Sequence, residues 1–412
     1  MNSGKGFAGD DLLTEILRRL PCKSAARFRC VSKRFLSILT NPIFLRRHRF
    51  HLHPPATALF LFRRASPHFT YLDLISLSPH HHKNNSTLDQ LSKFHKNEEE
   101  IINIHSCKGL MCVHTFINPR VENKSVGSQN RIYVYNPLTF ESRLIPRLNT
   151  KELMYNIIGV YMVFEPLSDY YNVVCAWERV IIGNNDGFRN PNERDIIMFS
   201  FYSSKTGDWS ASRAVLLIRK LDVEFQQGVV WNGNVHWFGS RRKLVCLDVG
   251  KECFNTMPEP LEFGAMRFWY FGESGGGLYL IGNRDGLMSL DVLELDEDYI
   301  EWTVKHRVDL SSFLQTIWFK AAVWTPQHQN RWNENEMYFI LGFNVLCFVD
   351  CGDGSEKLVI SVGDKIVLYD INGMEIEEIA KINPLKTTMV KRDVFEFKWF
   401  QVHQLIKTQV SL

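Results

Sequence analysis

Ser274 lies in the pattern G-x-S-x-G, which residues 272–276 fit as Gly-Glu-Ser-Gly-Gly. In proteins that use this pattern for catalysis, the serine is a nucleophile exposed on a sharp turn between a strand and a helix. Residues 268–271, Phe-Trp-Tyr-Phe, can form the strand. The glycine run after the serine begins helices poorly and favours a hairpin turn. The sequence therefore predicts a turn between two strands here, and we assign no catalytic residue.

Three stretches carry side chains that could ligate a metal ion. Two are histidine clusters, within residues 48–53 and 80–82, and neither has a cysteine or carboxylate close by to complete a site. The third is the acidic stretch 291–301, which lacks the residue order of a calcium-binding loop and lies between two predicted strands. No phosphate-binding glycine loop occurs either. We expect neither a metal nor a cofactor.

Composition limits the class of protein. The nine cysteines include no Cys-x-x-Cys pair, which favours reduced, mostly buried thiols over disulfides or a zinc site. The 412 residues are 45% apolar, enough for one large or two unequal domains with packed cores. No apolar run could span a bilayer, and the first nine residues lack the apolar core of a signal peptide. We expect no membrane contact, and a cytoplasmic and/or nuclear location.

The charge is unevenly distributed along the chain. Residues 1–64 carry 13 Lys/Arg against 3 Asp/Glu, whereas the remainder carries 35 against 42. A basic head could bind nucleic acid. Its arginines, however, fall inside segments whose apolar spacing already predicts helices, so a basic rim that faces an acidic protein partner is the simpler interpretation.

The basic head has apolar side chains at helical spacing. Asp10 and Asp11 are placed to cap a first helix, which Pro21 ends. Three further signals begin three more short helices: Ser24, Ser32 and Asn41-Pro42. Four short helices within roughly 40 residues bury too little surface to be stable alone. We therefore predict a docking module whose surplus apolar side chains are covered by another protein.

The order of these residues resembles the F-box. The run Asp-Asp-Leu-Leu-Thr-Glu-Ile-Leu-Arg-Arg-Leu-Pro and the later Arg-Phe-Arg-Cys-Val-Ser-Lys carry the resemblance. Ala8-Gly9 stand where the family usually has Leu-Pro, Ser32 where it has Cys, and Phe35 where it has Trp. The missing Leu-Pro removes apolar contact area, which would weaken docking by about 1–2 kcal/mol. The resemblance implies docking on the Skp adaptor of SCF-type ubiquitin ligases, and through it on the cullin scaffold, by nine residues: Leu12, Leu13, Ile16, Leu17, Leu20, Pro21, Phe28, Val31 and Phe35.

After residue 56 the periodicity changes from helical to strand-like. Residues 56–62 and 69–77 are short strand patterns, and 78–100 are polar and predict a long loop. From residue 101 onward, units of strand, turn and strand repeat loosely: 132–146, 161–178, 196–212, 244–258, 366–379 and, more weakly, 287–302. Two glycine-bounded aromatic stretches, 228–239 and 275–286, have the pattern of inner strands.

Many short antiparallel strands expose unpaired backbone unless the sheet closes on itself, and radial repetition leaves only short edges. This favours a β-propeller over a sandwich. The ordered stretches 105–113, 133–146, 164–174, 201–209, 228–237 and 367–379 also resemble the plant F-box-associated interaction domain, whose fold is related to kelch propellers. We therefore predict an α+β multidomain protein: a helical F-box (1–50), a connector with first strands and a polar loop (51–100), and a large all-β propeller-like domain (101–405).

The two resemblances together imply a non-catalytic substrate-recognition subunit of an SCF-type E3 ubiquitin ligase, in which the β-domain holds an unknown target protein. Three tryptophans near turns are candidates for the target-binding face: Trp177, Trp231 and Trp332. Two alternatives remain open. One is a propeller that binds or converts a small molecule, which would need converging polar side chains at the centre of the blades. The other is a basic nucleic-acid-binding regulator.

Overall fold

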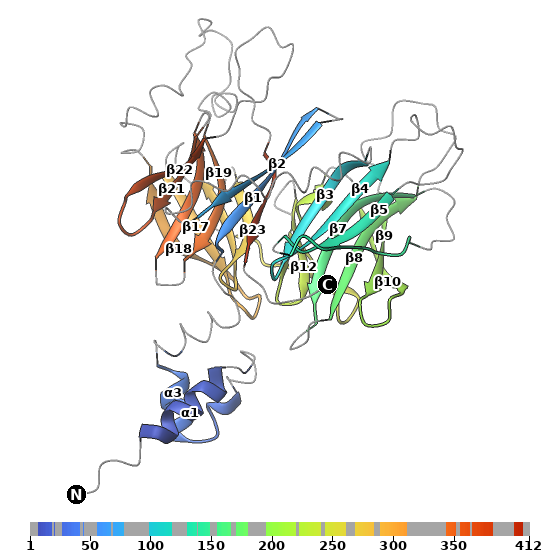
Figure 1. Ribbon diagram of the computed structural model, residues 1–412. Coiled ribbons are helices and arrows are strands. Elements are labelled where there is room, and N and C mark those ends of the chain that lie inside the picture. The colour runs from blue at the N-terminus through green and yellow to red at the C-terminus, as the bar shows by residue number, and fades with distance from the viewer. Residues whose placement is uncertain are drawn as a thin grey trace, which may run out of the picture.

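Figure 1 shows two parts of the chain, a pair of short helices near the N-terminus and a ring of β-sheets. The structure is a computed structural model of the 412-residue chain. It describes residues 7–18, 20, 27–41, 44, 56–66, 69–77, 99–117, 130–137, 139–148, 155–165, 170–179, 195–219, 222–239, 244–260, 268–283, 289–310, 343–351, 355–362, 365–381 and 399–406.

The helical part contains α1 (Phe7–Arg18) and α3 (Lys33–Leu39). The predicted cap at Ser32 is confirmed, because its hydroxyl accepts the N–H of Phe35 at 3.2 Å. The predicted cap at Asp10–Asp11 is wrong, since α1 begins at Phe7 and both aspartates lie inside it. The signals at Ser24 and Pro42 lie outside the described residues. Neither α1 nor α3 has the length and apolar character that a membrane crossing requires.

The described strands form six antiparallel sheets arranged as the blades of a propeller. Blades 1 to 5 have four strands each, in chain order from the centre outward. Blade 1 contains β3 (Glu99–Cys107), β4 (Leu110–Ile117), β5 (Asn130–Tyr135) and β6 (Ser142–Leu144). Blade 2 contains β7 (Tyr155–Phe164), β8 (Tyr171–Arg179), β9 (Asp195–Ser203) and β10 (Trp209–Ile218). Blade 3 contains β11 (Val229–Trp231), β12 (Asn234–Phe238), β13 (Leu244–Asp248) and β14 (Cys253–Thr256), and follows the short 3-10 helix η3 (Phe225–Gln227).

The remaining blades complete the ring. Blade 4 contains β15 (Phe268–Ser274), β16 (Gly277–Asn283), β17 (Ser289–Leu295) and β18 (Trp302–Asp309). Blade 5 contains β19 (Phe343–Asp350), β20 (Glu356–Val362), β21 (Lys365–Asp370) and β22 (Ile376–Lys381). Blade 6 joins the two ends of the β-domain, because β1 (Ala58–Ser66) pairs with both β2 (Phe69–Ser76) and β23 (Trp399–Leu405).

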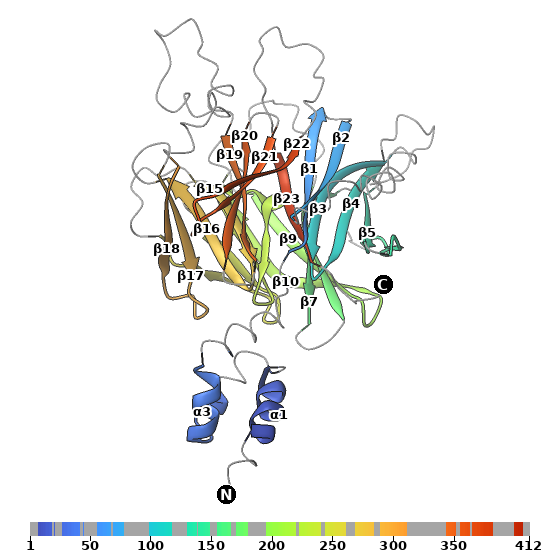
Figure 2. The ribbon, with the colours of Figure 1, turned by 60° about the vertical axis from the view of Figure 1, so that its left-hand side comes forward.

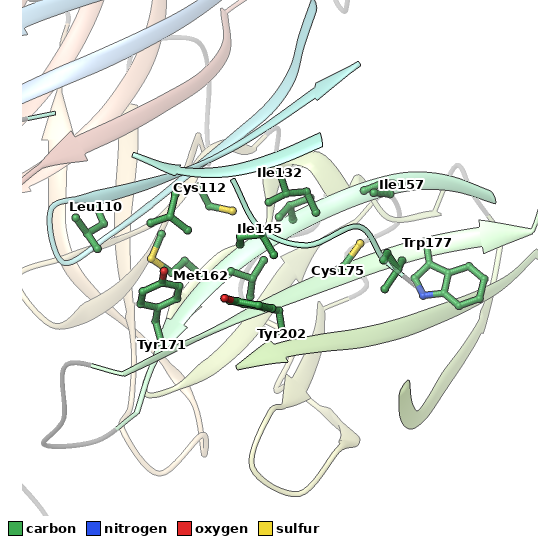
Figure 3. Packing of buried hydrophobic residues seen from close by; sticks show 14 of the residues in the cluster. Leu110, Cys112, Ile132, Ile145, Ile157, Met162, Tyr171, Cys175, Trp177 and Tyr202 are labelled. Atoms are coloured by element: carbon green, nitrogen blue, oxygen red, sulfur yellow. The ribbon is translucent and has the colours of Figure 1, made fainter. Parts of the chain in front are cut away.

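Strand β7 explains why the blades stack. Its last eight residues are all buried, so it has no solvent-facing side. Val160 and Met162 pack with blade 1, whereas Tyr161 and Val163 pack with blade 3. The sequence of a strand covered on both faces is a continuous apolar run, without the alternation of apolar and polar residues that a half-exposed strand shows. Figure 3 shows the first of these cores, with Cys112 and Ile132 of blade 1 beside Met162 and Cys175 of blade 2.

The innermost strands β3, β7, β11, β15, β19 and β23 contact one another in a closed ring. Strand β23, near the C-terminus, therefore lies between the first and fifth blades (Figure 2). This arrangement places β1 and β2, predicted as part of a connector, inside the propeller. Likewise Glu99, predicted within a polar loop, is buried at the start of β3.

One unit of the predicted repeat covers a different pair of strands from the others. Units 132–146, 196–212, 244–258 and 366–379 coincide with the two outer strands of blades 1, 2, 3 and 5, and unit 287–302 covers β17 of blade 4 and only the first residue of β18. Unit 161–178 instead spans β7 and β8, the inner half of the same blade whose outer half is 196–212. Both halves of blade 2 have the pattern of strand, turn and strand, so this pattern alone does not distinguish the inner half from the outer half. The weakest unit, 287–302, proves to be a regular member.

Candidate functional site

The two helices share a small apolar core of their own. Leu17 and Leu39 are each 1% exposed and pack with Phe44. Four further residues are partly buried against the same cluster: Leu13, Leu20, Phe35 and Ile38. Leu13 and Leu17 are four residues apart on α1 and so share one helix face, and Leu20 follows just after the helix ends; this face holds the module together.

The helical module also carries apolar side chains that are exposed. Leu12 is 65% exposed and lies one helical turn from Ile16, which is also exposed. Val31 is 60% exposed, and the ring of Phe28 stacks on that of Phe35 with centroids 5.8 Å apart. Large apolar side chains left in water on so small a module are candidates for a surface that a partner covers. This surface, defined by Leu12, Ile16, Phe28, Val31 and Leu36, is hereafter the helical docking surface.

The structure sorts the nine predicted adaptor-contact residues into four groups. Leu12, Ile16, Phe28 and Val31 lie on the exposed face. Leu13, Leu20 and Phe35 are partly buried against the helical core. Leu17 is a core residue, so its prediction as a direct contact is corrected to a packing role. Pro21 lies outside the described residues. Sequence reasoning missed Leu36, an exposed apolar residue on α3.

The predicted target-binding tryptophans are not on the surface. Trp177 is 7% exposed and its Nε1 donates to the Ser200 hydroxyl at 3.0 Å. Trp231 is 2% exposed and its Nε1 donates to the carbonyl oxygen of Gly276 at 2.9 Å. Both predictions are wrong, because indoles at strand ends fill the space between blades and find an internal hydrogen-bond acceptor. Trp332 lies outside the described residues.

Ser274 lies in the turn between β15 and β16, as predicted, and is buried. Its hydroxyl accepts the N–H of Asp350 at 3.0 Å and lies 3.4 Å from Oε1 of Gln404. An activated serine needs a base in contact with its hydroxyl. The contacts of this hydroxyl instead join blades 4, 5 and 6.

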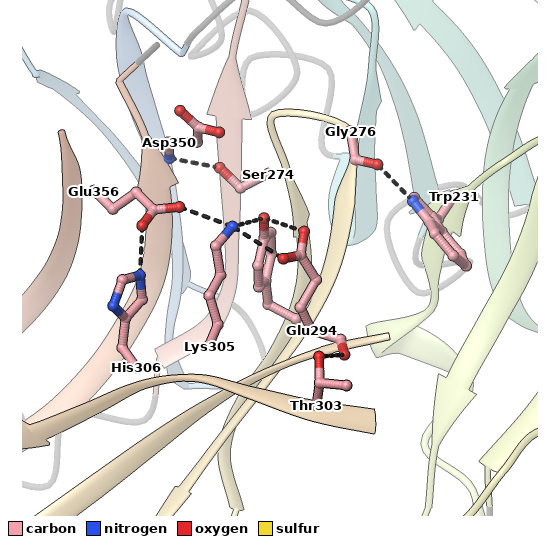
Figure 4. Close-up of polar contacts among 10 residues, drawn as sticks. Trp231, Ser274, Gly276, Glu294, Thr303, Lys305, His306, Asp350 and Glu356 are labelled. Atoms are coloured by element: carbon pink, nitrogen blue, oxygen red, sulfur yellow. Dashed lines mark hydrogen bonds and ion pairs between the residues drawn. The ribbon is translucent and has the colours of Figure 1, made fainter. Parts of the chain in front are cut away.

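The most extensive polar cluster joins blades 4 and 5 (Figure 4). Nζ of Lys305 lies 3.0 Å from Oε2 of Glu294 and 2.8 Å from Oε1 of Glu356. It also donates to the Tyr279 hydroxyl at 2.9 Å, while His306 contacts Glu356. The facing carboxylates and the phenol raise the pKa of Lys305, despite an opposing effect of burial. A permanently charged lysine between two carboxylates acts as a clamp between blades.

At the centre of the ring, the inner strands bring together neutral polar groups. Nδ1 of His105 accepts the N–H of Met162 at 3.2 Å, and the side-chain amide of Asn103 donates to the carbonyl oxygen of Gln226 at 3.2 Å. Burial lowers the pKa of His105 to about 3, with a smaller effect of His403, and burial lowers the pKa of His403 to about 4. These hydrogen bonds link neighbouring strands and give the centre a structural role.

The described residues contain no cluster of three or more histidine, cysteine or acidic side chains that could hold a metal ion. The eight described cysteines are free thiols. Burial raises the pKa of Cys107 and of Cys246 to about 12 each, which keeps these thiols protonated and unreactive at neutral pH.

Comparison with known proteins gives two matches along the chain. Residues 10–47 match the F-box domain, and residues 57–329 match the family described as F-box associated beta propeller domain. F-box protein At5g07610 of Arabidopsis thaliana is 26% identical over 98% of this chain and 92% of its own length. Putative F-box protein At3g52320, also from Arabidopsis thaliana, is 25% identical over 72% of this chain and 71% of its own length.

Similarity to solved structures is weaker. An oligogalacturonate lyase in complex with manganese has 9% sequence identity and a TM-score of 0.34, over 66% of this chain and 62% of the lyase. A similarity at that level supports no argument about function.

Proposed function

Because this chain belongs to the F-box-associated β-propeller family and carries an F-box at residues 10–47, we propose that it is the substrate-recognition subunit of an SCF-type E3 ubiquitin ligase. The F-box docks on the Skp adaptor, which connects it to the cullin scaffold. The propeller holds a target protein. The chain itself is non-catalytic, and the transfer of ubiquitin belongs to other subunits of the complex in the cytoplasm and/or nucleus.

The helical docking surface carries this proposal. Its five apolar side chains are exposed, whereas Leu17 and Leu39 form the core of the module. A Leu or Ile side chain left in water forgoes about 1.5–3 kcal/mol of burial free energy, which a partner recovers. The arginines of this basic head suit a partner with acidic residues around its groove.

The mechanism is one of effective concentration. A target bound to the propeller is tethered near the transfer machinery, so the encounter of its lysines with that machinery becomes intramolecular. No chemical step is required of this chain. The polar clusters around Lys305 and Ser274 are consistent with that role, because their hydrogen bonds and ion pairs join one blade to the next.

The test is co-purification with a Skp-type adaptor. Leu12→Asp combined with Ile16→Asp places two charges on the helical docking surface without touching its core, and should abolish co-purification. Ile300→Asp, at an exposed apolar position of blade 4, is the matched control and should bind as the unchanged protein does. Full co-purification of the double variant would refute adaptor docking. Far-ultraviolet circular dichroism and thermal unfolding verify that each variant is folded.

A further inference from the structure

A pocket of about 370 Å³ lies between blades 1 and 2. Its walls come from residues 130–132 at the start of β5, residues 144–148 after β6, and Tyr155 and Ile157 of β7. It therefore lies at the end of β6, the outermost strand of blade 1, which is only three residues long. Neither the Skp docking proposal nor the polar clusters described above involve these residues.

The walls of the pocket are held in place by contacts between the blades. Nε1 of Trp209 on β10 donates to the carbonyl oxygen of Pro146 at 2.7 Å. The Tyr155 hydroxyl donates to the carbonyl oxygen of Leu148 at 3.4 Å, and the Tyr155 ring meets the edge of Trp177 at a centroid distance of 5.9 Å. Ligand sites are usually formed in advance by such contacts. Trp177 thus supports a wall of the pocket instead of contacting a ligand.

The lining combines apolar side chains with positive charge. Among the described residues that line it, Arg131 and Arg147 are the charged ones and none is a carboxylate. The nearby Glu99 carboxylate is buried and accepts from the Arg131 guanidinium at 2.6 Å and from the Thr115 hydroxyl at 2.7 Å. A guanidinium has five N–H donors, so this bond leaves others for a ligand. Arg147 is exposed. The pocket is therefore complementary to an anionic group next to an apolar one.

An apolar row leads from the pocket to the edge of blade 2. Ile157 of the pocket is paired in register with Trp177, Trp177 with Met198, and Met198 with Val215. Direct cross-strand partners lie on the same face of a sheet. Val215 is exposed, as are the neighbouring pair Ile196 and Leu217, the latter at 59%. Ile157 and Trp177 are themselves buried, so the exposed members Val215, Ile196 and Leu217 add an apolar surface at the outer edge of blade 2.

We propose that this pocket and the adjoining apolar row bind the target, and that the bound element is a peptide segment with an anionic residue flanked by apolar ones. This proposal rests on the proposed function at one point, the identification of the bound peptide as part of the target protein. The anionic residue contacts Arg131 and Arg147, and the apolar residues cover Leu144, Val215 and Leu217. The pocket volume suits one or two side chains, and the row then accommodates the rest of an extended segment.

The experiment selects peptides from a random displayed library on the full-length protein. Enriched sequences should combine an Asp or Glu with neighbouring Leu, Ile or Phe residues. Synthetic versions of an enriched peptide should bind at least tenfold more weakly to Arg147→Glu and to Leu217→Asp, both at exposed positions that should not affect folding. Lys205→Glu, at the other end of the same blade, is the control and should bind normally. Replacing the acidic residue by phosphoserine distinguishes a carboxylate site, which loses affinity, from a phosphate site, which gains it.

Three outcomes would overturn the proposal. In the first, the unchanged protein enriches no peptides relative to the Leu217→Asp protein. In the second, the enriched peptides lack an acidic residue. In the third, the enriched peptide binds all the variants equally well. The Leu12→Asp/Ile16→Asp protein separates the two proposals, because it should lose the adaptor and keep the peptide. If the unchanged protein binds the peptide but not the adaptor, docking fails and the pocket stands.

Discussion

Gln404 on β23 donates from its side-chain amide to the backbone carbonyl oxygen of Phe348 on β19, at 2.9 Å. The same amide lies 3.2 Å from the carbonyl oxygen of Glu273 on β15. The backbone carbonyl oxygen of Gln404 accepts from the Ser106 hydroxyl on β3 at 3.5 Å. One residue near the C-terminus therefore links the inner strands of blades 1, 4 and 5. The ring is closed by polar contacts as well as by the pairing of β23 with β1.

Gln404→Leu should destabilise the propeller by about 1–3 kcal/mol, because it leaves two carbonyl oxygens without their donor. Gln404→Glu should cost at least as much, since a carboxylate would face those oxygens. Denaturant unfolding followed by tryptophan fluorescence measures both. Unchanged stability in both variants would show that β23 closes the ring by backbone pairing alone.

Stability should decrease in acid. Burial lowers the pKa of His105 to about 3, below the ordinary value of 6.5 that it regains on unfolding. The unfolded chain thus binds more protons than the folded chain between these pH values, and stability is lost as the pH falls from 6.5 toward 3. For His105 the loss is about 2 kcal/mol at pH 5. Unfolding free energies at pH 7 and pH 5 should differ less in His105→Gln than in the unchanged protein. Identical pH dependence in the two proteins would contradict this account.

Lys305→Met should destabilise the contact between blades 4 and 5 by about 1–3 kcal/mol, because Glu294 and Glu356 would face each other without a cation. Adding Glu294→Gln should restore part of the loss by removing one of the like charges. The measurement is the thermal unfolding midpoint of the single and double variants. A double variant less stable than Lys305→Met would show that carboxylate repulsion is not the cause.

Leu17→Ala and Leu12→Ala should affect different properties of the helical module, its stability and its adaptor binding respectively. Leu17→Ala opens a cavity in the helical core and should cost about 2–5 kcal/mol of that module's stability. Leu12→Ala should leave its stability nearly unchanged and weaken adaptor binding. Hydrogen exchange of α1 amides, together with adaptor affinity, distinguishes the two effects. Equal loss of protection in both variants would mean that Leu12 also belongs to the core.

Local signals in the chain predicted several elements correctly. The hydroxyl of Ser32 caps α3 because it accepts from the N–H of Phe35, a donor only three residues away. The hairpin turn at residues 274–277 follows from glycines that adopt positive φ angles at Gly275 and Gly276. The strand pattern and its turns together indicated a propeller. Each of these inferences depends on interactions between residues close in sequence.

The sequence by itself determined the helices, most strands and the propeller class, since periodicity and turn residues act over a few positions. Only the tertiary structure decided which apolar side chains stay exposed. Leu12 and Leu17 are both leucines of α1, yet one faces solvent and the other a core with Leu39. It also decided that β23 closes the ring and that a pocket lies between residues 130–132 and Tyr155. These outcomes depend on packing between segments far apart in the chain, which no local pattern encodes.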